Sequence, residues 1–85
     1  MRHARPEDLG PLERLLADLR ALPGLTERSP GTFYRKARAF LHFHEDPKGL
    51  FADVRGPDDG PFERIDVTGA EGQAELLRVA RERLA

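Results

Sequence analysis

The segment from residue 40 to 54, FLHFHEDPKGLFADV, constrains the fold most because it predicts a β-hairpin. Aromatic residues are frequent on both sides of EDPKGL, as is typical of strands that end at a turn. Pro47 fixes φ for the second position of a type I turn, Asp46 can accept a hydrogen bond from the backbone that follows it, and Gly49 can adopt the left-handed conformation. We therefore predict two antiparallel strands joined at this turn.

The register of this hairpin decides which residue faces His42, and the sequence leaves two registers open. A loop from residue 46 to 49 places His42 opposite Asp53 and collects apolar residues of both strands on one face. A type I turn with a glycine bulge places His42 opposite Val54 instead. A slip of one residue turns a strand's side chains to the other face, so only one register can hold. The turn residues favour the second register, which separates His42 from Asp53.

One helix is predicted at each end of the chain. In GPLERLLADLRALPG, leucines recur every three or four residues, and Pro23 and Gly24 end the pattern. The second helix is expected from about Ala70 to the end of the sequence, where Thr68 and Glu71 have the spacing of a capping box. Its predicted apolar stripe comprises Ala70, Gln73, Ala74, Leu77, Ala80 and Leu84, with Leu76 beside it.

Two further strands are predicted outside the hairpin. A tight turn at Lys36 and Ala37 would pair Phe33 with Phe40, and FERIDV alternates well enough to form a last strand. The segment LTERSPGT is interpreted as a linker. The order α-β-β-β-β-α predicts an α+β fold, an antiparallel sheet of about four strands with an N-terminal and a C-terminal helix. We expect one domain over residues 1–85, with a loose segment at residues 1–8.

Composition excludes several classes of function. The 14 basic and 15 acidic side chains give a formal net charge of -1, so nucleic acid and anionic membranes gain no general attraction. The chain has no cysteine, which excludes disulfides, cysteinyl zinc sites and thiol nucleophiles. Its first ten residues lack the apolar region of a signal peptide, and no apolar run approaches the ~18 residues of a membrane span. We expect a cytoplasmic protein that does not enter a membrane.

The succession LRALPGLTE, FYRKARAFLHF and GLFADVR resembles the opening of the MmcQ/YjbR-like bacterial proteins. In those proteins a helix ends in a Leu-Pro-Gly turn, here Leu22, Pro23 and Gly24, and antiparallel strands with a basic turn follow. The resemblance covers about two thirds of the chain, and the later part, GPDDGPFERIDVT, has no counterpart in that longer family. It implies the strand order and a suggested DNA-binding role, with no catalytic residues. Other small bacterial families of unknown function have a similar strand order.

The histidines of HFHED form a candidate metal site. Residues two apart on a strand point to the same face, so His42 and His44 would be neighbours with Cα atoms about 6.6 Å apart. A closed zinc site needs four ligands and a catalytic site needs three with water. Asp53, Glu45 or His3 would have to supply a further ligand. Acid-base catalysis by a histidine is a third reading, and the sequence favours a structural role, in which the two histidines pack beside neighbouring phenylalanines.

The segment YRKAR is a candidate nucleic-acid site. Arg35, Lys36 and Arg38 lie near a predicted turn beside Phe33 and Tyr34, and such a mixture can hold a phosphate backbone and stack bases. The same charges also protect a strand edge from pairing with another sheet, which is the interpretation that the sequence favours. Nucleic acid as a partner is therefore disfavoured but left open.

The sequence as a whole favours a non-catalytic binding or self-associating module that needs no cofactor. A half-covered sheet in so short a chain leaves apolar surface, and a homodimer would bury it through Phe40, Phe51 and Phe62. A metal-binding protein that uses His42 and His44 is the first alternative. A nucleic-acid-binding module that uses the basic turn is the second.

Overall fold

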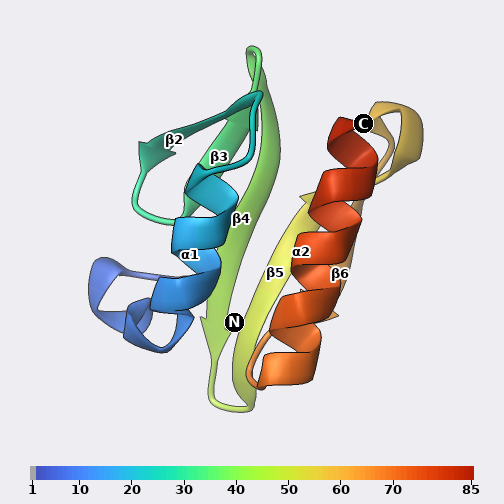
Figure 1. Cartoon of the computed structure of the whole chain (residues 1–85). Helices are drawn as coiled ribbons and strands as arrows, with labels where there is room; N and C mark the ends of the chain where they lie inside the picture. The colour runs from blue at the N-terminus through green and yellow to red at the C-terminus, as the bar shows by residue number, and fades with distance from the viewer. Residues whose placement is uncertain (1) are drawn as a thin grey trace.

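A computed structural model describes residues 2–85 as an antiparallel sheet with two helices on one face (Figure 1). The α+β fold predicted from the sequence is confirmed. The strands are β1 (Arg2–His3), β2 (Leu25–Ser29), β3 (Thr32–Arg35), β4 (Arg38–Asp46), β5 (Gly49–Arg55) and β6 (Phe62–Asp66). The helices are α1 (Glu13–Arg20) and α2 (Ala70–Leu84), with short 3-10 turns at η1 (Pro6–Asp8), η2 (Gly10–Leu12) and η3 (Pro57–Asp59).

The sheet follows chain order, β2-β3-β4-β5-β6, and all neighbouring strands are antiparallel. β1 pairs with the far end of β4, beyond the part of β4 that pairs with β3. Strand β2 corrects the interpretation of LTERSPGT as a linker. Its polar residues suit an edge strand, and the Glu27 carboxylate accepts hydrogen bonds from the Gly31 amide, at 2.9 Å, and from Arg20 of α1. These bonds tie the edge strand to both its turn and the helix.

The core lies between the helices and the sheet. Four leucines of the first helical segment, Leu12, Leu15, Leu16 and Leu19, are buried there. The sheet contributes Phe33, Phe40, Leu41, Phe43, Ala52 and Val54. Helix α2 adds Leu76, Val79 and Ala80, so the buried face agrees with the predicted stripe at Ala80 and at the adjacent Leu76. Leu77 and Leu84 of that stripe pack against the core while partly exposed, but Ala70 and Ala74 are exposed. α1 lies over the β3 and β4 side of the sheet and α2 over β5 and β6 (Figure 1).

Helix α2 begins without the predicted capping box. Gly69 is the N-cap residue, and no side chain caps the helix. Thr68 instead uses its hydroxyl on the sheet, where Oγ1 accepts a hydrogen bond from the Leu50 amide at 3.0 Å. This contact needs Gly49, whose φ is +143° and whose missing Cβ would lie 2.2 Å from Thr68 Oγ1. Gly49 of the hairpin turn therefore also leaves space for Thr68, which lies between β6 and α2.

The β3-β4 turn has the predicted position but a different register. Lys36 adopts a φ of +57°, and Arg35 faces Arg38 across the turn. A β-bulge follows, and it places Phe33 opposite Leu41 rather than the predicted Phe40. The extra residue of a bulge redirects its neighbours. Here Phe40 joins the core at 2% exposure.

The segment expected to be loose carries β1 and η1 in its described part, residues 2–8. Arg2 pairs with Glu45 at 2.7 Å and with Asp8 at 3.4 Å. The Ala4 amide donates a hydrogen bond to the Phe43 carbonyl at 3.0 Å, and Ala4 is buried. These contacts fix the course of the chain over the end of β4. Among residues 2–85, no helix has the length and apolar character needed to cross a membrane.

Candidate metal centre

The β4-β5 register places His42 opposite Asp53. The prediction that His42 faces Val54 is wrong, because the strands close directly on Pro47 and Lys48 with no bulge between them. This register puts Leu41, Phe43, Ala52 and Val54 together in the core, where each is at most 1% exposed. Burial of these side chains outweighs the local preference of the turn residues.

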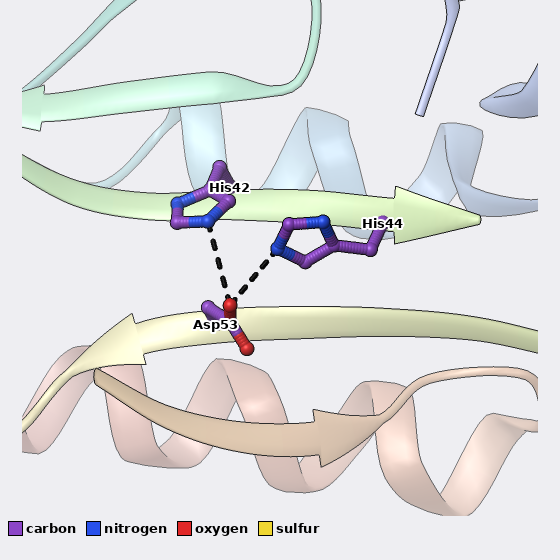
Figure 2. Close-up of side chains that lie close together, drawn as sticks. All are labelled: His42, His44 and Asp53. Atoms are coloured by element: carbon purple, nitrogen blue, oxygen red, sulfur yellow. Dashed lines mark hydrogen bonds and ion pairs between the residues drawn. The ribbon is translucent and has the colours of Figure 1, made fainter. Parts of the chain in front are cut away.

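The two histidines and the aspartate meet on the face of the sheet opposite the helices (Figure 2). Asp53 Oδ2 lies 2.9 Å from His44 Nε2 and 3.4 Å from His42 Nε2. One donor atom from each residue lies within 4.8 Å of the others. The side chains are 21%, 18% and 12% exposed for His42, His44 and Asp53, so the cluster is half-buried but open to solvent. Strand alternation and register alone bring these three groups together.

Arg64 of β6 completes the surroundings of Asp53. It lies opposite Asp53, with Nε 2.9 Å from Oδ1 and Nη2 3.1 Å from Oδ2. Burial of Asp53 acts to raise its pKa, but hydrogen bonds from Arg64 and His44 outweigh burial and hold the pKa below the ordinary value. The carboxylate is therefore ionised at neutral pH and available as a ligand.

Burial lowers the pKa of His42, the charge of His44 adds to this effect, and Asp53 only partly opposes it. A histidine with a lowered pKa is neutral at pH 7 and keeps a free lone pair on one ring nitrogen. Metal coordination requires this neutral form. The environment of His42 thus favours the state that binds a metal ion.

His3 lies beside the cluster because β1 places it opposite His44. Its ring centroid is 5.8 Å from that of His42, with the rings stacked, and 6.0 Å from that of His44. His3 Nε2 lies 3.2 Å from Thr32 Oγ1 on β3. Glu45, the other predicted alternative ligand, is instead paired with Arg2.

The separations of the donor atoms suit a tetrahedral ion. With bonds of about 2.0 to 2.1 Å, two ligand atoms of a tetrahedral zinc site lie about 3.3 Å apart. The observed 3.4 Å between His42 Nε2 and Asp53 Oδ2 is close to this value, and the 2.9 Å to His44 Nε2 is a few tenths short. All three donor atoms lie within 4.8 Å of one another, so small side-chain rotations would admit an ion between the three groups.

The structure places the residues of the predicted basic turn apart from this centre. Arg35 donates a hydrogen bond to the Arg83 carbonyl at 2.9 Å, while Lys36 and Arg38 are exposed. Asp59 lines the same hollow as these basic residues and reduces their positive potential. Nucleic-acid binding by this turn stays a prediction.

The three phenylalanines proposed for self-association are not equivalent. Phe40 is buried in the core and offers no surface to a partner, and Phe51 is half-buried. Phe62 is 36% exposed, with the Arg55 guanidinium 4.1 Å from its ring centroid and the His42 ring edge-on at 5.0 Å. Self-association therefore rests on Phe62 and Phe51 and stays a prediction.

Sequence reasoning missed Arg64 altogether and treated His3 only as an alternative. The alternation of FERID could have assigned Arg64 to the outer face, but only the register of β5 and β6 shows that it faces Asp53. β1 has two residues, too few for any periodic pattern.

No known protein family, curated protein or solved structure matches this chain. The resemblance to the MmcQ/YjbR-like proteins thus gains no support from comparison. The function has to be inferred from the geometry of the site.

Proposed function

We propose that the protein binds a divalent transition-metal ion through His42, His44 and Asp53. The observation that carries the proposal is the position of one carboxylate oxygen, Asp53 Oδ2, within 2.9 and 3.4 Å of two imidazole nitrogens. The β4-β5 ladder sets this arrangement, and the core beneath it holds the ladder in register. Preformed donor groups lower the cost of assembling a site around the ion.

The donor set selects the kind of ion. Two imidazoles and one carboxylate suit zinc and the other borderline divalent metals, whereas Mg²⁺ and Ca²⁺ prefer oxygen ligands throughout. The chain has no thiol, and soft thiolate ligands are the usual choice for Cu(I). We therefore propose Zn²⁺ as the reference ligand for this site.

Arg64 supports the proposal as an outer partner of the aspartate. Ligating carboxylates are commonly hydrogen-bonded in turn, which fixes their orientation. Arg64 Nε holds Oδ1 at 2.9 Å, and this leaves Oδ2 directed at the histidines. The contact of Arg64 Nη2 with Oδ2 would lengthen when an ion takes that oxygen.

The proposal is tested by zinc titration of the full chain without a histidine tag. We expect saturable 1:1 binding, followed calorimetrically, and metal retained after gel filtration. His42→Ala/His44→Ala should abolish binding, and Asp53→Asn should weaken it at least about tenfold, since loss even of an outer partner costs about 10- to 100-fold. Asp59→Asn, in a loop away from the centre, is the matched control and should bind as the wild type does.

Circular dichroism of the metal-free variants checks that each one is folded. Absence of saturable zinc binding by the folded wild-type protein would overturn the proposal. Equal affinity in the wild type and in a folded His42→Ala/His44→Ala variant would also overturn it, because the ion would then lie elsewhere.

A further inference from the structure

Strand β1 holds the third histidine over the proposed site. His3 pairs with His44 across the β1-β4 ladder, so both side chains lie on the outer face of the sheet. The backbone is anchored on both sides of His3, by the ion pair of Arg2 with Glu45 at 2.7 Å and by the hydrogen bond of the Ala4 amide to the Phe43 carbonyl at 3.0 Å. The position of His3 is thus set by contacts that do not involve its own ring.

The spacing of the three imidazole rings fits a shared ion. A ring bound through nitrogen at about 2.0 Å has its centroid about 3.2 Å from the metal, so two such rings at tetrahedral angles have centroids about 5.2 Å apart. The observed separations are 4.7 Å for His42 and His44, 5.8 Å for His3 and His42, and 6.0 Å for His3 and His44. Each value lies within about 1 Å of the one expected for a common ligand sphere.

We infer that His3 is a fourth ligand, and that the ion therefore joins β1 to the β4-β5 hairpin. This inference rests on the proposed function. His3 would exchange its contact with Thr32 Oγ1, now 3.2 Å away at the surface, for the metal. The His3 backbone already pairs with β4, so a rotation of its side chain would bring the ring to the ion.

A fourth protein ligand changes what the site does. Three protein ligands leave a position for water and substrate, whereas four close the coordination sphere and give a structural site. With His3 bound, the ion would add a further link between this two-residue strand and the hairpin. Because an ion that binds only the docked form stabilises that form, occupancy of the site would strengthen the docking of β1.

The test compares His3→Ala with Thr32→Val in the full chain, using Zn²⁺ for affinity and Co²⁺ as a spectroscopic probe. The visible bands of Co²⁺ depend on which atoms coordinate it, so exchange of an imidazole nitrogen for water changes their position and intensity. We expect His3→Ala to weaken zinc binding at least about tenfold and to change the cobalt spectrum, because water would take the place of His3. Thr32→Val removes only the competing contact of His3, so it should retain both the affinity and the spectrum of the wild type.

Amide hydrogen exchange at Ala4 reports the docking of β1 directly. Zinc should slow this exchange in the wild type and in Thr32→Val, but not in His3→Ala. Unchanged affinity and unchanged cobalt bands in His3→Ala would overturn the inference and leave the three-ligand proposal intact. The same changes in Thr32→Val would also overturn it, since the role of His3 would then be structural. Failure of the proposed function has a separate signature, which is the absence of zinc binding by the wild type.

Discussion

Arg64→Gln tests whether an ion lies beside Asp53, because Arg64 places a positive charge close to the proposed site. Arg64 Nη2 is 3.1 Å from Asp53 Oδ2, and its side chain is half exposed. An ion about 2.1 Å beyond that oxygen would lie about 5 Å from the guanidinium. Charges of +2 and +1 at about 5 Å repel by about 1.7 kcal/mol in a water-like dielectric, which is appropriate to so exposed a side chain.

This repulsion predicts tighter binding when the charge is removed. About 1.7 kcal/mol corresponds to about a 15-fold gain in zinc affinity at low ionic strength. At 0.15 M salt the Debye length is about 8 Å, so the repulsion falls by about half and the gain to about fivefold. Glutamine keeps a side chain that can donate a hydrogen bond to Asp53 and therefore removes mainly the charge.

The assay is competition for zinc against a chromophoric chelator at two ionic strengths. Arg14→Gln is the matched control, because Arg14 lies on α1 at the opposite face of the molecule and should leave the affinity unchanged. Weaker binding by Arg64→Gln at both ionic strengths would refute the reasoning, since positioning of the carboxylate would then outweigh repulsion. Equal binding by all three proteins would place the ion away from Asp53.

Two further predictions concern the scaffold. Gly72→Ala should destabilise the fold by about 2 kcal/mol or more, because the new Cβ would lie 1.8 Å from the Asp66 carbonyl oxygen. Gly10→Ala is the control and should be nearly neutral, because its Cβ would meet nothing within 4 Å. Urea denaturation at pH 7 compares the stability of the two variants. The hydrogen bond from Arg20 holds the pKa of Glu27 below its ordinary 4.5. The stability that the ionised Glu27 adds to the fold is therefore present above pH 4.5 and is lost as the pH falls through the lower pKa of the folded state. Glu27→Gln should therefore cost about 1 kcal/mol at pH 7 and little in acid, and an equal cost at pH 7 and pH 2.5 would contradict this origin.

The features predicted correctly from the sequence are those that depend on residues close together in the chain. The leucine spacing of α1 and the turn at residues 46–49 each carry their signal within one segment, and both elements are present. Strand β2 gave no such signal, because its polar residues become a strand only by pairing with β3. The capping box failed for a similar reason, since the Thr68 hydroxyl bonds to Leu50, a residue 18 positions away in the chain.

The hairpin register is the point at which local and global preferences conflict. The turn residues alone favour a glycine bulge, and this preference comes only from the backbone angles of a few residues. The observed register instead buries four apolar side chains, each of which gains about 1.5 kcal/mol or more on leaving water, apart from the smaller Ala52. The free energy gained by burying these side chains exceeds the conformational preference of a single turn. Pattern analysis that weighed the whole apolar face would have chosen this register.

The decision on register also creates the site. Because side chains alternate along a strand, the burial of Leu41 and Phe43 toward the helices directs His42 and His44 to the opposite face, and the burial of Val54 does the same for Asp53 on β5. A slip of one residue would bury the carboxylate and separate it from both imidazoles. The apolar core thus positions the donor atoms without contacting them. Substitutions that keep the core packed should therefore leave the positions of the donor atoms unchanged. The proposed function lies on the outer face, but the core on the other face sets its geometry.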